Sequence, residues 1–161
     1  MSRPVREVSR SVVYSTFALS LVGLGISGYL TFTHFEGTKF LACSTTGLLN
    51  CSTVTTSPQS YVFGAPVAVI GLVGYAVIVA LNSPWAWRST HYAVHLARVA
   101  VITGSMIFVL WLVAAELLYI DHICEWCSGV HAVTFVLFVI LARVAPRQLG
   151  WSSAAHETAA L

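Results

Sequence analysis

Two cysteines in a CxxC arrangement, Cys124 and Cys127, are the residues of this sequence best suited to chemistry. Because residues three apart lie on nearly the same face of a helix, two such thiols can meet across a single turn. A helix N-terminus carries a partial positive charge, which stabilises a thiolate and lowers the pKa of the first cysteine. The negative charge of Glu125 opposes that shift. The motif, standing at the head of a long apolar run, therefore predicts a reactive dithiol at a membrane surface.

Two further cysteines, Cys43 and Cys51, lie in the longest polar connection of the chain. Four cysteines permit three pairings, and their spacing alone does not choose among them. Two pairs on one side of a helical bundle can form a relay by thiol–disulfide exchange, in which each transfer needs a thiolate, a disulfide within reach and a mixed disulfide. Electrons from a soluble dithiol then need a final acceptor. In a bilayer a lipid-soluble quinone can fill that role.

The rest of the sequence is too apolar for a soluble domain. Hydrophobic residues make up 57% of the chain and charged residues 9%, whereas a soluble domain has about 25% charged residues. The apolar residues form four runs, each long enough for the about 20 residues that cross a bilayer. We therefore predict an all-α integral membrane protein, a four-transmembrane-helix bundle with an extracytoplasmic cysteine-bearing loop that caps the ligand site.

The 161 residues are expected to form a single domain. The predicted segments are helix 1 at about 11–35, an outer loop at 36–62, helix 2 at about 64–82, an inner loop at 83–95, helix 3 at about 96–120, helix 4 at about 124–144 and a cytoplasmic tail at 145–161. Gly23, Gly25 and Gly28 in helix 1 favour close approach of another helix. Leu41-Ala42-Cys43 resembles a lipoprotein cleavage site, but polar residues separate it from the apolar run, so a retained first helix is favoured.

The basic residues predict the orientation of the chain. Seven of the eight precede the first run, lie near the second connection or close the fourth run, and only Lys39 lies in the first connection. Because cytoplasmic loops carry the excess of Lys and Arg, we expect both termini in the cytoplasm and all four cysteines outside. Disulfide-forming cysteines also belong in an oxidising compartment. A multi-pass cell (inner) membrane protein is predicted.

Three polar features of the apolar runs and their connections are candidate ligand contacts. The hydroxyl-rich segment after Cys51, which includes Ser57 and Ser60, is either a lid that faces a ligand or an ordinary solvated loop. Glu116 is the one charge in the third run, and is either functional or in contact with interfacial water. His131 lies about one turn below Cys127 on the same helix face, and either bonds to a neighbouring helix or holds a ligand carbonyl.

Several short motifs together resemble one protein family. They are Cys43-x7-Cys51-Ser52-Thr53-Val54, Ser57-Pro58, Val62-Phe63-Gly64-Ala65-Pro66, Glu116-Leu117-Leu118 and Ile123-Cys124-Glu125-Trp126-Cys127. Between about residues 11 and 144 the chain resembles the vitamin K epoxide reductase family, and most of all its bacterial members. The resemblance implies a four-helix bundle around a quinone of the menaquinone, ubiquinone or vitamin K type. It also implies that the protein reoxidises a DsbA-like thioredoxin-fold partner, which introduces disulfides into exported proteins.

The same resemblance implies a role for each cysteine. Cys43 and Cys51 form the outer pair, of which Cys43 accepts electrons from the partner and Cys51 attacks Cys124. Cys127 of the active-site pair then faces the quinone. Many bacterial members carry a fused thioredoxin domain, but only 17 residues follow Val144 here. The partner is therefore expected to be a separate chain.

The resemblance also implies where the quinone is held. In the vertebrate enzymes an asparagine before the second helix and a tyrosine four residues after the last cysteine hold the quinone oxygens. Ser60 and His131 occupy those positions here, and Ser57 and Phe63 complete the expected contacts. The departure weakens the case for vitamin K epoxide as the substrate.

Two other interpretations use the same residues. The first is vitamin K epoxide or quinone reduction in an endoplasmic reticulum membrane. The second is a non-catalytic membrane protein that binds zinc through Cys124, Cys127, His122 and Cys43. No metal is expected, because zinc ligands usually come as two compact, close-spaced pairs. A transporter is disfavoured by the scarcity of ionisable residues in the spans, and no basic cluster indicates nucleic acid.

Overall fold

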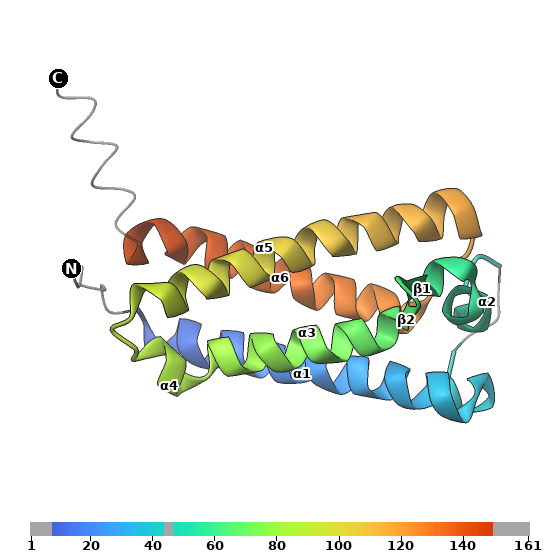
Figure 1. The fold of residues 1–161 in the computed structure, drawn as a ribbon, viewed down its shortest axis with the longest axis horizontal. Coiled ribbons are helices and arrows are strands. Elements are labelled where there is room, and N and C mark those ends of the chain that lie inside the picture. The colour runs from blue at the N-terminus through green and yellow to red at the C-terminus, as the bar shows by residue number, and fades with distance from the viewer. Residues whose placement is uncertain (1–7, 44–46, 150–161) are drawn as a thin grey trace, which may run out of the picture.

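The computed structural model describes residues 8–43 and 47–149. Arg3 and Arg6 of the basic N-terminal arm, and the predicted tail beyond residue 149, lie outside these residues. Four long helices form a bundle, in which each packs on two neighbours (Figure 1). They are α1 (Arg10–Glu36), α3 (Val67–Asn82), α5 (Tyr92–Ala115) and α6 (Glu125–Gln148).

The short elements gather at the two ends of this bundle. Between α1 and α3 lie η1 (Thr38–Phe40), α2 (Cys51–Thr56), η2 (Pro58–Ser60), β1 (Tyr61–Val62) and β2 (Ala65–Pro66). The π-helical turn η3 (Glu116–Ile120) follows α5 at the same end, whereas α4 (Pro84–Trp87) lies at the opposite end, where α1 begins and α6 ends (Figure 1). The cysteine-bearing loop therefore covers one end of the bundle only.

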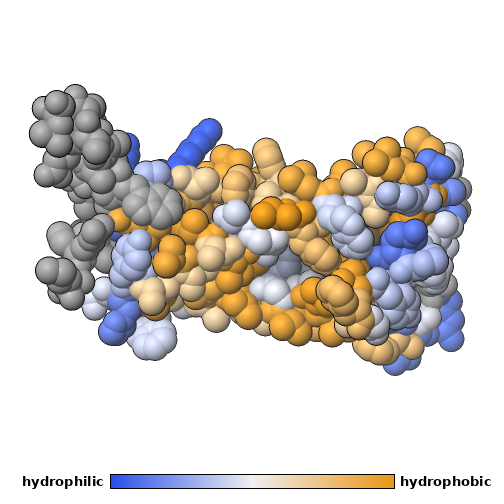
Figure 2. Space-filling view, turned by 45° about the horizontal axis from the view of Figure 1, so that its top comes forward, coloured by the Kyte–Doolittle hydropathy of each residue, from blue (hydrophilic) through white to orange (hydrophobic). Residues whose placement is uncertain are grey.

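The surface of the bundle matches a bilayer. Three helical segments are long and apolar enough to cross a membrane, namely Arg10–Glu36, Tyr92–Ile120 and Glu125–Gln148. Figure 2 shows a broad apolar band across the middle of the face in view, with hydrophilic residues toward its two ends. The 16 residues of α3 extend only about 24 Å, which is less than the about 30 Å of a hydrocarbon core. These features support a membrane protein, and the number of four spans stays a prediction.

The close approach predicted for helix 1 occurs at Gly23. A Cβ there would overlap the ring of Tyr75 on α3, so only glycine fits. The Tyr75 hydroxyl in turn lies 2.7 Å from Thr134 Oγ1 and donates to the Val130 carbonyl at 3.2 Å, which joins α3 to α6. Nothing lies within 4 Å of a Cβ built on Gly25, so the prediction was wrong for that glycine.

The helices are longer than predicted at the end opposite the cysteines. Helix α5 begins at Tyr92, and Arg98, expected beside the connection, is buried inside the bundle. Its Nε donates to the Leu81 carbonyl at 2.8 Å and its guanidinium lies 3.8 Å from the ring centre of Trp87. These contacts satisfy part of a charge that the sequence pattern places near water, and its buried Nη2 has no hydrogen-bond partner among the described residues. Helix α6 likewise continues past Pro146 to Gln148.

Candidate redox site

A short backbone pairing brings the polar loop to the start of α6. The Ile123 N–H donates to the Leu48 carbonyl at 2.9 Å, and the Asn50 N–H donates to the Ile123 carbonyl at 3.1 Å. Leu49 and Ile123 thereby form an isolated parallel bridge. The residue before Cys51 is thus bonded to the residue before Cys124, which places these two cysteines side by side.

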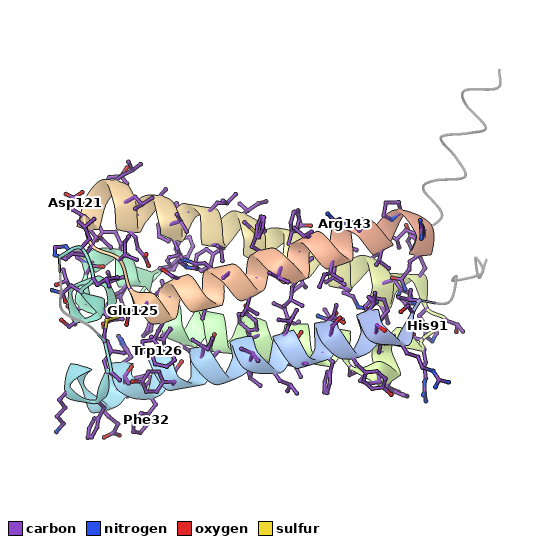
Figure 3. The ribbon with its side chains drawn as sticks, turned by 180° about the vertical axis from the view of Figure 1, so that it is seen from behind. Phe32, His91, Asp121, Glu125, Trp126 and Arg143 are labelled. Carbon is purple, nitrogen blue, oxygen red and sulfur yellow. A yellow bond between two sulfur atoms is a disulfide. The ribbon has the colours of Figure 1, made fainter. Side chains whose placement is uncertain are left out.

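A second tether holds the other arm of the loop. The indole N–H of Trp126 donates to the Ala42 carbonyl at 2.6 Å, and its ring centre lies 4.7 Å from that of Tyr29 on α1. The Tyr29 hydroxyl accepts a bond from the Ala42 N–H at 2.8 Å and donates to the Phe40 carbonyl at 2.9 Å. Figure 3 shows Trp126 directed from α6 toward α1, at the same end as Glu125. The residue before Cys43 is therefore fixed to both helices.

The four cysteines form one pair and two free thiols. Cys43 and Cys51 are joined by a disulfide, with their Cα atoms 6.1 Å apart, whereas Cys124 and Cys127 are free. The outer pairing implied by the family resemblance is thereby confirmed. Cys51 and Cys124 are both completely buried and pack with Val54 in one apolar cluster, against which Cys43 and Cys127 also lie.

Cys124 is the N-cap of α6. Its backbone is extended, with φ −101° and ψ 120°, and its sulfur accepts a hydrogen bond from the Cys127 N–H at 3.4 Å. The Cys127 thiol also bonds to this sulfur, and that bond is the largest cause holding the pKa of Cys124 below its ordinary value. Burial and the charge of Glu116 oppose the shift, while the backbone N–H groups of Trp126 and Cys127 support it. Cys124 is therefore poised to react as a thiolate.

The source of this shift can be tested by replacing Cys127. Without the Cys127 thiol, in Cys127→Ala, we expect the pKa of Cys124 to be higher than in Cys127→Ser, because serine keeps a side-chain donor for the Cys124 sulfur. The backbone bond to the sulfur remains in both variants. The pKa of Cys124 is measured from the pH dependence of thiolate absorbance in the reduced proteins. Equal pKa values in the two variants would show that the helix N-terminus alone sets the shift.

Glu125 lies on the solvent side of the site. Its carboxylate and the sulfur atoms of Cys43 and Cys51 all lie within 4.8 Å of one another. Because the two sulfurs are bonded to each other, this group is not a set of metal ligands. Glu125 thus places a carboxylate beside the loop disulfide, on the solvent side from which a partner would approach.

The four donors of the zinc interpretation are not gathered in the described residues. Cys43 is in the disulfide, and His122 Nδ1 lies 3.0 Å from the Ile120 carbonyl oxygen. Cys124 and Cys127 contact each other instead. The arrangement favours sulfur exchange over metal binding.

Below the cysteines lies a cavity of about 340 Å³, lined mainly by apolar side chains of α1, α3, α5 and α6. Of the predicted ligand contacts, Ser57, Ser60 and His131 line it, together with Cys127. Phe63 is not among the lining residues. It lies fully exposed at the turn between β1 and β2, with a positive φ of 51°.

The polar groups of the cavity differ in their availability to a ligand. The Ser57 hydroxyl donates to the Val54 carbonyl at 2.8 Å, and the Ser60 hydroxyl donates to the Ser57 carbonyl at 2.6 Å. Gln59 and His131 also line the cavity, and neither side chain has a hydrogen-bond partner among residues 8–43 and 47–149. Sequence reasoning missed Gln59, because the direction of a side chain in a single helical turn has no periodic signal.

Glu116 closes the cavity beside the CxxC pair. It is only 6% exposed, and it lines the cavity from the first position of η3. The backbone N–H of Cys124 is directed at its carboxylate, and both thiols lie within its electrostatic reach. The structure therefore places Glu116 in the interior rather than in interfacial water.

These features define a membrane protein with a buried thiol pair, an adjoining disulfide and an apolar ligand cavity, which is the construction of a membrane redox protein. The chain belongs to the vitamin K epoxide reductase family, whose family model matches residues 14–142. No curated protein matches the chain. Family membership makes the protein an oxidoreductase, and it confirms the resemblance seen in the cysteine motifs.

Proposed function

We propose that the protein is a quinone-reducing thiol oxidase of the bacterial cell membrane, which reoxidises a DsbA-like thioredoxin-fold protein and so drives disulfide formation. The observation that carries this proposal is the burial of Cys51 against Cys124 in one cluster, with Cys127 on the wall of the cavity. Sulfur exchange requires a thiolate and a disulfide in contact. The site supplies that contact between a loop pair open to partners and a thiol pair beside an apolar cavity.

In this proposal electrons pass from the partner to Cys43 and Cys51, then to Cys124 and Cys127, and finally to the quinone. A partner thiolate attacks Cys43, and Cys51 leaves as the thiolate. Cys51 then attacks Cys124 of the oxidised CxxC pair, which releases Cys127. When the partner's second thiol and then Cys43 have resolved the two mixed disulfides, the partner and the loop pair are oxidised and the CxxC pair carries two electrons and two protons. Quinone takes both, and the CxxC disulfide forms again.

The cavity fits a quinone. Its volume of about 340 Å³ lies within the about 300–1,000 Å³ of small-molecule sites, and its apolar walls suit a ring with a prenyl chain. Gln59 on η2 and His131 on α6 offer unengaged polar groups for the quinone oxygens, whereas the hydroxyl protons of Ser57 and Ser60 are engaged by carbonyls. We assign the quinone contacts to Gln59 and His131, and the acceptor is a substrate that leaves as quinol.

Replacing these two residues should weaken quinone binding without blocking the sulfur chemistry. In His131→Phe and Gln59→Leu we expect the KM for quinone to rise about tenfold each, the loss of about one hydrogen bond to a buried ligand. The KM is measured with a short-chain quinone and dithiothreitol. Ser60→Ala is the matched control, because its hydroxyl proton is already engaged. A larger effect in Ser60→Ala than in Gln59→Leu would reverse the assignment.

The orientation proposed for the protein places the cysteines outside the cytoplasm. The disulfide end carries Glu125 and Asp121, and the opposite end carries Arg143 and His91 (Figure 3). Basic residues at one end of the bundle favour the cytoplasm for that end. Both termini then face the cytoplasm, and the loop pair faces the compartment where exported proteins are oxidised.

The experiment that tests the function compares acceptors side by side. Purified protein in lipid nanodiscs, supplied with dithiothreitol, is expected to reduce a short-chain menaquinone or ubiquinone. Reduced DsbA-like protein should serve as a donor in the same assay. Reduction of vitamin K epoxide at a rate equal to that of quinone would favour the endoplasmic reticulum type of reaction, and reduction of no quinone would contradict the proposal.

A further inference from the structure

The buried carboxyl group of Glu116 has no role in the sulfur exchange described above. It lies on the cavity wall, next to the backbone of Cys124 and the thiol of Cys127. No side chain of opposite charge bonds to it within residues 8–43 and 47–149. An ionisable group held inside a membrane span without a counter-ion marks a functional position.

The local backbone conformation places Glu116 at that position. Helix α5 ends in the π-helical turn η3, a form that is rare in helices and frequent at functional sites. Glu116 and Ile120, the first and last residues of this turn, both line the cavity. Asp121 then ends the helix in a left-handed conformation, with φ 55°. The chain turns directly into the CxxC segment, so Glu116 and Cys127 line the same cavity.

We propose that Glu116 is the proton-transfer residue for quinone reduction, an inference that rests on the proposed function. The CxxC dithiol loses two electrons and two protons as its sulfurs form one S–S bond, and the quinone gains both and becomes the quinol. The cavity is apolar, so water is a poor carrier of these protons there. Glu116 gives a proton to one quinone oxygen and regains one from the Cys127 thiol, then gives a second to the other quinone oxygen and regains one from Cys124, so both protons reach the quinol and the protonation of Glu116 is unchanged after each turnover.

The exposed acids nearby have no such position. Glu125 faces the loop disulfide, and Asp121 is exposed at the far end of η3 and does not line the cavity. Asp121→Asn is therefore a matched control for Glu116→Gln. Asparagine tolerates the left-handed conformation of residue 121, and the substitution removes one carboxylate from the same turn.

Measuring the reduction of the CxxC disulfide and its reoxidation by quinone separately distinguishes proton transfer by Glu116 from a purely structural role. Glutamine keeps the size of the side chain and its acceptor for the Cys124 N–H, but it carries no exchangeable acid proton. In Glu116→Gln we expect oxidation of the pre-reduced protein by a short-chain quinone to slow about a hundredfold. Reduction of the CxxC disulfide by dithiothreitol should stay within about threefold of the wild type, since that step needs no proton at the cavity wall. Asp121→Asn should keep both rates, and Glu116→Asp, which retains the acid on a shorter chain, should fall between.

A third measurement uses no quinone. Replacing Glu116 by glutamine should not raise the pH at which the Cys124 thiolate forms, because only an ionised Glu116 opposes that thiolate and glutamine carries no charge. A variant that forms the Cys124 thiolate at least as readily as the wild type, but reduces quinone more slowly, has lost proton transfer to the quinone and not the reactivity of its sulfur. Glu116→Gln protein that is reoxidised at the wild-type rate would overturn the inference. The inference would also be overturned if both half-reactions slowed equally in Glu116→Gln, or if the rate of quinone reduction fell equally in Glu116→Gln and Glu116→Asp. A wild-type protein that no quinone reoxidises would instead contradict the proposed function.

Discussion

Replacing Cys124 by serine is expected to lower quinone reduction by about three orders of magnitude or more, to the background rate, whichever thiol supplies the electrons. Cys124 links the CxxC pair to the loop pair, because it packs against Cys51 and accepts the Cys127 N–H. A serine oxygen fills the same capping position on α6 but forms no disulfide. Cys127→Ser should lose as much, since the CxxC pair then has no second sulfur to oxidise.

The measurement is quinol formation in nanodiscs, with dithiothreitol and with reduced DsbA-like protein as separate donors. Ser128→Ala is the control, because Ser128 adjoins the motif in α6 and does not line the cavity. It should keep the wild-type rate. Retention of dithiothreitol-dependent activity by Cys127→Ser would show that quinone is not reduced through the CxxC pair.

Replacing Cys43 by alanine should separate the protein donor from the small one. With Cys43 absent, the rate with DsbA-like protein is expected to fall about a hundredfold, while the rate with dithiothreitol stays within about threefold of the wild type. A small dithiol can reach and resolve the buried sulfurs directly. A folded partner needs the exposed arm of the loop disulfide, and Cys43 is less buried than Cys51.

The same variant should accumulate a disulfide between Cys51 and Cys124. Cys51 remains packed against Cys124, and the Cys43 thiol, which would attack Cys51 and release Cys124, is absent. Mass mapping after acid quench during turnover detects this species. Cys51→Ala should lose partner activity equally but accumulate no such bond. Normal partner oxidation by Cys43→Ala would rule out the order of the relay.

The two tethers of the loop explain why exchange between the pairs can be fast. The bridge between Leu49 and Ile123 holds Cys51, and the indole bond from Trp126 to Ala42 holds Cys43. Groups held in contact react as though at very high concentration, because the entropy of bringing them together has already been lost on folding. The described arms of the loop, at residues 42–43 and 48–51, are thus held against the site, and Trp126 in the middle of the CxxC motif contributes one of the two tethers.

The cysteine spacing and the composition are enough to predict a redox-active dithiol in a membrane protein. The CxxC spacing at the head of an apolar run predicts a capped, reactive thiol, and Cys124 is indeed the N-cap of α6. Composition alone predicts helices in a membrane, since local periodicity and hydropathy need no distant contact. The motifs around the cysteines were specific enough to indicate the family that the match over residues 14–142 confirms.

Which of these groups meet depends on contacts between distant segments of the chain. The Cys43–Cys51 pairing was open from spacing alone, and the approach of Cys51 to Cys124 depends on a bridge between residues 49 and 123 that no local pattern encodes. The position of Glu116 inside the cavity, the availability of Gln59 and the exposure of Phe63 likewise depend on a π turn, a single helical turn and a hairpin. Side-chain directions in such irregular segments follow from packing between distant parts of the chain, and a sequence read in order contains no period from which to predict them.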